Sequence, residues 1–192
     1  QADAAIEQAM RLAPDQATTR ITRGYLLMLR DFDWRGAEAE LKRAVELAPD
    51  DGDAQYMLGL VRASQGDLAQ AVELTRKALQ LNPRSADWYR WLVAYLMPLG
   101  RLDEAEQTIA KAIELQPKGI YNYHLLAIVK VLRKDPAAAR KAAETEPPGP
   151  WRGFALAMAA QVGPDRAAAD ASLQDVEQYA DGWAFQMAQV YA

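Results

Sequence analysis

The motif Ala-x-x-Leu-x-Pro recurs along the chain at nearly equal intervals, and it limits the possible folds more than any other feature. Its prolines are Pro14, Pro49, Pro83 and Pro117, so the last three are 34 residues apart and the first two are 35 residues apart (49 − 14 = 35). A fixed period of this length indicates stacked supersecondary units. The chain is therefore expected to begin inside a unit, and the first copy of the unit to be truncated.

The second half of each unit carries small or apolar residues on one helical face. In the middle unit these are Leu68, Ala71, Thr75, Ala78 and Leu79. Their spacing matches one side of a helix with about 3.6 residues per turn. The same spacing recurs in the two neighbouring units, from residues 34 and 102 onward. Each unit therefore contains an amphipathic helix.

Helix starts and stops follow the same period. Asp33, Asp67 and Asp135 stand where a carboxylate can accept hydrogen bonds from free amides of a first helical turn, and Pro136 suits the first helical position. The motif prolines end each helix, because proline lacks an amide donor and disfavours a helical residue before it. The predicted unit is helix, turn, helix, turn.

At these residues the chain resembles the tetratricopeptide repeat, whose unit has small residues at its eighth, twentieth and twenty-seventh positions and proline at its thirty-second. Gly59, Ala71, Ala78 and Pro83 occupy these positions in the middle unit. The resemblance implies an all-α fold, an α-solenoid of antiparallel helix hairpins that wind into a right-handed superhelix.

We expect residues 1–192 to form a single repeat domain. Its predicted parts are a half repeat at 2–14, regular repeats at 18–51, 52–85 and 86–119, degenerate repeats at 120–149 and 150–180, and a truncated repeat at 181–192. Tyr25 and Val93 replace the small eighth residue in two repeats, which predicts that the two helices of those hairpins lie slightly further apart.

The resemblance also implies a binding site, because the first helices of such arrays line a concave groove. The candidate groove residues are Thr22, Leu26, Tyr56, Leu60, Arg90, Ala94, Tyr121, His124 and Ile128. Tyr56, Arg90 and Tyr121 are the expected anchors for a peptide, since aromatic residues and arginine dominate interface energetics.

The composition argues against an enzyme and against a cofactor or metal site. His124 is the one histidine and there is no cysteine, so a catalytic triad or a zinc site would need distant carboxylates to converge. The glycines occupy repeat or turn positions rather than a phosphate-binding loop. We therefore predict no catalytic residue, no cofactor and no metal.

Charge and hydropathy narrow the class of partner. A net charge of −4 opposes direct nucleic-acid binding, and no apolar run is long enough for membrane insertion. The expected partner is therefore a protein or a peptide. It could also be a second copy of the chain, bound through open solenoid ends to give a homo-oligomer. The lack of cysteine does not distinguish a reducing from an oxidising compartment. We expect a cytoplasmic location, with the periplasm as the alternative.

Two known ligand classes of the family are not supported. Arrays that clamp the carboxyl terminus of heat-shock chaperones carry lysine, arginine and asparagine at fixed groove positions. The corresponding residues here are Thr22, Leu26, Met57, Asp87 and Trp91. Asparagine occurs only at Asn82 and Asn122, so the asparagine ladder of the glycosyltransferase-linked arrays is missing as well.

The segment Leu29-Arg-Asp-Phe-Asp-Trp34 and the following Ala37–Ala44 resemble repeats attached to bacterial signalling proteins.

The predicted function is a protein-interaction module or scaffold that binds a peptide in a groove, within a larger protein. Two alternatives stay open. One is a structural or self-association segment that regulates an attached signalling enzyme or transcription regulator. The other is small-ligand sensing in a pocket near residues 147–164, where Pro147, Pro148 and Pro150 shorten a unit by about four residues.

Overall fold

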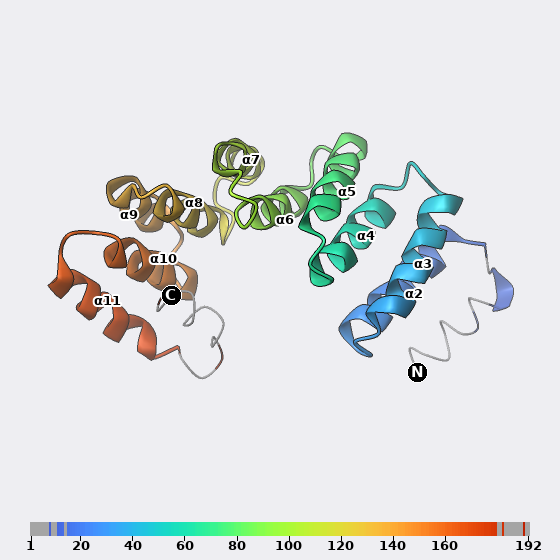
Figure 1. The fold of residues 1–192 in the computed structure, drawn as a ribbon, viewed down its shortest axis with the longest axis horizontal. Helices are drawn as coiled ribbons and strands as arrows, with labels where there is room; N and C mark the ends of the chain where they lie inside the picture. Colours follow the sequence, from blue (N-terminus) through green and yellow to red (C-terminus); the bar gives the residue numbers. More distant parts are fainter. Residues whose placement is uncertain (1–7, 9–10, 14, 180–181, 183–189, 191–192) are drawn as a thin grey trace. The chain divides into compact units, whose positions relative to one another are not determined.

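The computed structural model describes residues 8, 11–13, 15–179, 182 and 190. The helices of this part are α2 (Ala17–Leu29), α3 (Trp34–Leu47), α4 (Gly52–Ser64), α5 (Leu68–Leu81), α6 (Ala86–Leu96), α7 (Leu102–Leu115), α8 (Asn122–Leu132), α9 (Pro136–Thr145), α10 (Pro150–Gln161) and α11 (Arg166–Glu177). The described residues contain no strand (Figure 1). The prediction of an all-α fold is confirmed for this part of the chain.

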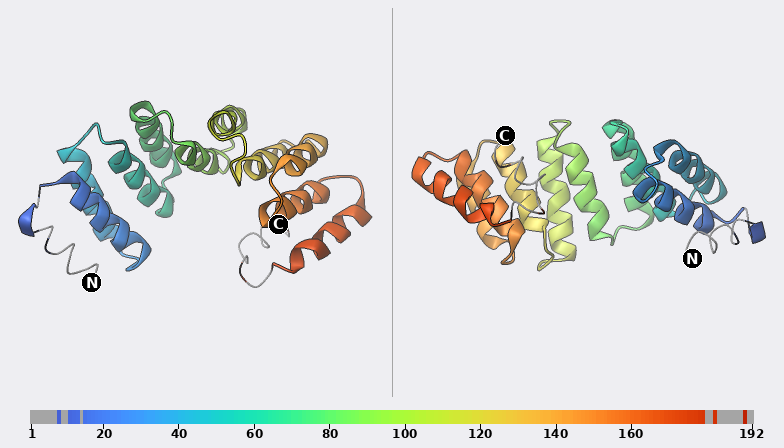
Figure 2. Two further views of the ribbon diagram at one scale, coloured as in Figure 1. Left: turned by 180° about the vertical axis from the view of Figure 1, so that it is seen from behind. Right: turned by 90° about the horizontal axis from the view of Figure 1, so that it is seen from below.

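The chain divides into two compact units, and each is described by itself. The first unit, Gln1–Leu99, holds α2 to α6, and the second, Gly100–Ala192, holds α7 to α11. Within the units, α2 pairs with α3, α4 with α5, α8 with α9, and α10 with α11 as antiparallel hairpins (Figures 1 and 2). The predicted half repeat 2–14 and truncated repeat 181–192 lie almost wholly outside the described residues.

The predicted aspartate caps begin the second helices of the hairpins. The backbone amide of Gly36 donates to Asp33 at 2.9 Å, and that of Gln70 donates to Asp67 at 3.0 Å. Asp135 accepts likewise from the amide of Ala138 at 3.0 Å, directly before Pro136 at the start of α9. Each carboxylate satisfies an amide that has no partner within the helix, which explains why these helices begin where they do.

The second helices bury the faces that their sequence spacing predicts. In α3, Ala37, Leu41 and Ala44 have no exposed surface, and the equivalent Ala71 and Ala78 of α5 are buried as well. In the first unit Leu41 joins Met28, Met57, Leu58 and Val61 in one cluster that links α2, α3 and α4. Burial of this shared apolar surface holds consecutive hairpins together.

Gly24, rather than the residue after it, marks the close approach of α2 to α3. A Cβ atom on Gly24 would lie 2.7 Å from Cγ of Leu41, just as one on Gly59 would lie 3.1 Å from Oγ1 of Thr75. Tyr25 is 45% exposed. The prediction that Tyr25 forces these two helices apart is therefore wrong, because its side chain points away from their contact.

The length of the loop after α2 explains why Gly24, and not Tyr25, occupies the position of the small residue. It spans residues 30–33, whereas the loop between α4 and α5 spans residues 65–67 and is one residue shorter. The additional residue in the period thus lies between α2 and α3. Positions in α2 correspond to those in α4 at a spacing of 35 residues (59 − 24 = 35), while α3 and α5 keep a spacing of 34 (68 − 34 = 34).

A substitution at Gly24 tests this register. Gly24→Val is expected to lower the free energy of unfolding by about 2 kcal/mol, because the branched side chain overlaps Leu41. The same replacement one residue later, Tyr25→Val, is the matched control and should change stability by less than about 0.5 kcal/mol. Urea denaturation followed by circular dichroism measures both. Equal losses would contradict the assigned register.

The second unit contains the shortened hairpin. α9 has 10 residues, while α3, α5 and α7 each have 14, so the predicted loss of about four residues is confirmed. α9 ends before Glu146 and the proline-rich segment, and α10 begins at Pro150. α10 and α11 lie within the segment 150–180, where a degenerate repeat was predicted.

Candidate functional site

The first helices of the first unit form one continuous face. α2 lies against α4, and α4 contacts α6 through the stacked rings of Tyr56 and Trp88, whose centroids are 5.3 Å apart. Six of the predicted groove residues lie on these three neighbouring helices. They are Thr22, Leu26, Tyr56, Leu60, Arg90 and Ala94.

Tyr56 is half-buried in the middle of this face. Its ring rests on Trp88, and Trp88 in turn lies so close to α4 that a Cβ atom on Gly52 would be 2.9 Å from Cη2 of the indole. Burial raises the pKa of Tyr56 far above its usual value, and the negative charge of Asp87 raises it further. The phenol therefore stays protonated at physiological pH and can donate a hydrogen bond.

Charged and aromatic groups flank Tyr56 on α6. Arg90 and Asp87 form an ion pair one turn apart, and Asp87 is the more exposed partner. Trp91 is exposed and its ring lies 6.1 Å from that of Tyr95. The Tyr95 hydroxyl is buried and has no hydrogen-bond partner among the described residues. α6 thus carries a guanidinium, a carboxylate and large aromatic rings along a single helix.

The sequence interpretation missed Tyr25 as part of this face. With the register set by Gly24, the equivalent of Leu60 is Tyr25 (60 − 25 = 35), not Leu26. Tyr25 is 45% exposed, so its ring projects from α2, the helix that lies against α4. The 35-residue interval between Pro14 and Pro49 was the signal for the shift, but it does not tell where the additional residue lies.

The predicted residues on α2 have other roles. The Thr22 hydroxyl donates to the carbonyl oxygen of Thr18 at 2.9 Å, within its own helix. Leu26 is half-buried. On α4, Leu60 is also half-buried and packs against the cluster that contains Leu58. These apolar side chains support the face from below rather than project from it.

In the second unit the structure buries His124, so its side chain does not line an open groove. His124 is 1% exposed and packs in a cluster with the rings of Tyr121 and Trp151, whose centroids each lie 5.0 Å from the imidazole and 4.5 Å from each other. The Nδ1 atom of His124 is 2.9 Å from the carbonyl oxygen of Trp151 and must therefore donate to it. Because α9 is short, α10 begins early and covers this position.

Nε2 of His124 is buried without a hydrogen-bond partner in the described part of the chain. Burial lowers the pKa of His124 to about 4, although the hydrogen bond to Trp151 opposes the shift. The imidazole is therefore neutral at pH 7. It acts here as a packed aromatic ring with one satisfied donor.

Glu146 has a structural role in this region that the sequence interpretation missed. Its carboxylate is 1% exposed and accepts from the backbone amides of Tyr121, at 2.5 Å, and His124, at 2.9 Å. It thereby caps α8, whose own N-cap residue, Tyr121, has φ of 80° and makes no side-chain cap. In the sequence Glu146 only precedes a proline, so nothing local marks it as a cap 22 residues away (146 − 124 = 22).

Ile128 belongs to the core of the second unit. It packs against a cluster that includes Phe154, Met158 and Val176. Phe154 is the counterpart of Tyr56 in α10 and is fully buried, with its ring 6.0 Å from that of Tyr179. Of the positions in this unit that were expected to face a groove, His124 is therefore buried by the chain itself, and Tyr121 and Ile128 are half-buried.

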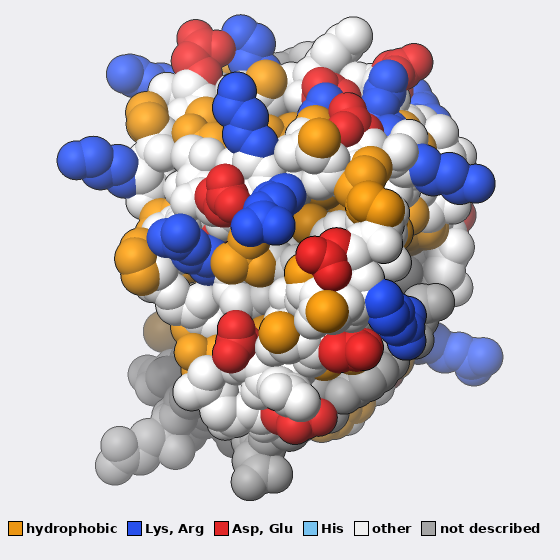
Figure 3. All heavy atoms as spheres, turned by 90° about the vertical axis from the view of Figure 1, so that its left-hand side faces the viewer, with side chains coloured by type: hydrophobic (Ala, Val, Ile, Leu, Met, Phe, Trp, Pro, Cys, Tyr) orange, Lys and Arg blue, Asp and Glu red, His pale blue; other side chains and the backbone are white. Residues whose placement is uncertain are grey.

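Within the described ranges no three His, Cys, Asp or Glu side chains lie close enough together to hold a metal ion. No described helix is both long and apolar enough to cross a membrane. On the face drawn in Figure 3, acidic and basic side chains alternate among apolar ones, and its described side chains form no patch of a single charge.

The part of the chain with the regular period matches a known family. Two sequence models, both described as tetratricopeptide repeat, match residues 27–83 and 62–128. Together they span 27–128, which is more than half of the 192 residues. The matched region includes α3, α4, α5 and α6, which carry the regular period and most of the face described above.

Solved structures of similar fold cover nearly the whole chain. PilW, a type IV pilus biogenesis factor, has a TM-score of 0.83 at 16% identity, over 100% of this chain and 90% of that one. TTC0263, a thermophilic tetratricopeptide protein of Thermus thermophilus, has a TM-score of 0.71 at 17% identity, over 91% and 97%. YrrB, described as having an unusual peptide-binding site, has a TM-score of 0.64 at 19% identity, over 89% and 81%. At these identities the similarity concerns the fold alone.

Proposed function

The chain belongs to the tetratricopeptide repeat family, and on that premise we propose that it is a protein-interaction module whose first unit binds a peptide segment of a partner. The proposed contact face is formed by α2, α4 and α6. Its central residues are Tyr25, Tyr56 and Arg90. Compared with the groove predicted from the sequence, Tyr25 takes the place of Leu26, and His124 is left out.

One observation carries the proposal. Tyr56 and Arg90 occupy equivalent positions of adjacent first helices (90 − 56 = 34), and Tyr25 is exposed on α2, which lies against the helix of Tyr56. Tyrosine and arginine combine apolar area with directional hydrogen bonding, and they are the residues on which binding energy concentrates. Trp88 beneath Tyr56 holds the phenol in place, so little side-chain entropy is lost on binding.

The structural relatives support the same reading at a coarser level. YrrB is described as having a peptide-binding site, and it shares this fold. Peptide binding by stacked helices also requires no catalytic constellation, which agrees with the side chains found on this face. The donor phenol of Tyr56 and the guanidinium of Arg90 suit backbone carbonyl and carboxylate groups of an extended peptide.

A peptide selection tests the proposal without a known partner. Peptides selected from a random displayed library against the full chain are expected to bind the wild-type protein. Calorimetry should then show affinity at least about tenfold weaker for Tyr56→Ala and for Arg90→Ala, because each variant removes a central contact. Arg76→Ala is the matched control, since Arg76 pairs with Glu73 one turn away on α5, outside the face.

The control variant should keep wild-type affinity. If the selected peptides bind Tyr56→Ala and Arg90→Ala as tightly as the wild type, the face on α2, α4 and α6 is not the binding site. A selection that yields no binding peptide would count against the interaction function itself.

A further inference from the structure

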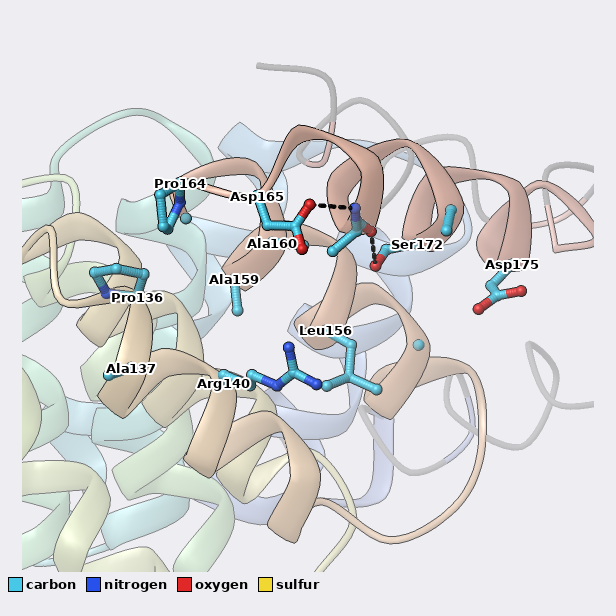
Figure 4. A pocket seen from close by; sticks show the side chains of 14 residues that line it. Pro136, Ala137, Arg140, Leu156, Ala159, Ala160, Pro164, Asp165, Ser172 and Asp175 are labelled. Carbon is cyan, nitrogen blue, oxygen red and sulfur yellow. Dashed lines mark hydrogen bonds between the residues drawn. The ribbon is translucent and has the colours of Figure 1, made fainter.

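A pocket of about 500 Å³ lies over α10, between α9 and α11 (Figure 4). We call it the α10 pocket. Small or apolar side chains from all three helices line most of it, among them Ala137, Leu156, Ala160, Ala168 and Ala171. Its size falls within the range of about 300–1,000 Å³ that is usual for small-molecule sites. All its residues belong to the second unit.

A regular hairpin has a concavity at the same place, between α3, α4 and α5, but its chemistry differs. Lining residues of α10 and α11 correspond to residues of α4 and α5 at a constant spacing of 98 positions (160 − 62 = 98), which is three repeats of 34 less the four residues missing after α9. Three long polar residues there are replaced by alanine in the α10 pocket: Arg62 by Ala160, Gln70 by Ala168 and Glu73 by Ala171. The α10 pocket is therefore an apolar version of a site that is polar in the regular repeat.

Two other junctions between hairpins, α3–α4 and α7–α8, carry an ion pair that this site lacks. Glu38 on α3 binds Arg62 on α4 at 2.7 Å, and Glu106 on α7 binds Lys130 on α8 at 2.5 Å. The equivalent of Glu106 on α9 is Arg140 (140 − 106 = 34), so the charge is reversed. Ala160 stands where the cationic partner would be. The pocket thus carries one positive charge, that of Arg140, and no charged group at position 160 to pair with it.

Arg140 has only a weak partner of its own. Among the described residues its ion pair is with Glu144 on the same helix, at 2.9 Å, and the two side chains are 69% and 50% exposed. Exposed pairs of this kind contribute little. A guanidinium has five N–H donors and can bind a carboxylate in addition to Glu144.

The polar groups on the opposite wall are already engaged or are acidic. Asp165 accepts from the backbone amide of Ala168 at 3.1 Å, and the Ser172 hydroxyl donates to the carbonyl oxygen of Ala168 at 2.7 Å (Figure 4). Asp175 lies on the same side. The carboxylates of Asp165 and Asp175 disfavour a ligand with more than one negative charge.

We propose that the α10 pocket binds a small monocarboxylic acid with an apolar body. The carboxylate pairs with Arg140 and supplies the opposite charge that Ala160 does not, and the hydrocarbon lies against Leu156 and the alanine faces of α10 and α11. This site is separate from the peptide face of the first unit. It gives the chain a means of responding to a small metabolite as well as to a protein.

The test uses octanoate on the full chain, with alanine methyl groups labelled for NMR. Octanoate is expected to produce saturable shifts confined to the methyl groups of the pocket, such as those of Ala160 and Ala171. Octanol and octylamine have the same hydrocarbon length without the negative charge, and they should bind at least about tenfold more weakly, because a charge-assisted hydrogen bond is lost. Absence of pocket shifts, or equal binding of octanol, overturns the proposal.

Variants locate the site. Arg140→Ala should weaken octanoate binding about tenfold or more, while Arg166→Ala, which removes an exposed arginine paired with Asp170 on α11, should leave it unchanged. The double variant Arg140→Glu with Ala160→Arg rebuilds the ion pair of the regular hairpin, so it should fold normally and abolish binding. Wild-type affinity in either Arg140 variant would show that the site lies elsewhere.

Discussion

Replacing Glu146 by alanine is expected to lower the free energy of unfolding of the second unit by about 3 kcal/mol. The substitution leaves two amides at the start of α8, those of Tyr121 and His124, without the carboxylate that they share. Each buried donor without an acceptor costs about 1–3 kcal/mol, and water replaces part of that loss once the site opens. The residue contacts no proposed ligand, so the effect is on stability alone.

Hydrogen exchange gives the most specific measurement of this effect. The amides of Tyr121 and His124 should exchange much faster in Glu146→Ala, and urea denaturation should show the lower stability. Glu146→Gln keeps one acceptor and is expected to fall between the two proteins. The control is Glu144→Ala, two residues earlier, where the side chain is exposed and the change should be within about 0.5 kcal/mol. Unchanged protection of both amides in Glu146→Ala would contradict the assigned cap.

Acidification is expected to destabilise the second unit through His124. Its pKa is about 6.5 in the unfolded chain and about 4 in the folded protein, because burial disfavours the charged ring. Between these values the unfolded state binds the proton and the folded state does not. The contribution is therefore complete above pH 6.5 and is lost progressively as the pH falls toward 4, to a total of about 3 kcal/mol.

The groups around His124 offer the protonated ring little compensation. The carbonyl of Trp151 accepts from Nδ1 in both protonation states, and the flanking Tyr121 and Trp151 are uncharged rings. The nearby carboxylate of Glu146 is already engaged by two backbone amides. Protonation of Nε2 would place a donor where the described residues supply no acceptor.

His124→Phe separates this titration from those of the carboxylates. The variant keeps an aromatic ring packed against Tyr121 and Trp151 but loses the hydrogen bond, so it should be about 1 kcal/mol less stable at pH 7.5. Urea denaturation from pH 4 to 7.5 should then show a smaller loss of stability on acidification than in the wild type. An NMR titration that found a pKa near 6.5 for His124 in the folded protein would refute the expectation.

The repeat and its helices could be predicted from the sequence because their determinants are local. A cap such as Asp67 acts on an amide three residues away, and a buried face such as that of Ala71 and Ala78 follows from helical periodicity. The shortening of α9 was likewise visible in the prolines at 147, 148 and 150. Interactions within a turn or two leave a direct pattern in the sequence.

The composition of the candidate sites was decided by contacts between segments far apart in the chain. A single additional residue placed in the loop 30–33 exchanges Tyr25 for Leu26 on the proposed peptide face, and the period alone does not locate that residue. The early start of α10 places Trp151 over His124, which converts a predicted groove residue into part of the core.

The sequence by itself therefore determined the family, the all-helical hairpins and where most helices begin and end, since each depends on residues within about one or two turns of each other. Only the tertiary structure decided which faces stay open. The cap from Glu146 spans 22 residues, and the α10 pocket depends on Arg140 on one helix and Ala160 on the next. Such pairs meet because of how hairpins pack, and packing depends on loop lengths and side-chain volumes that no local pattern records.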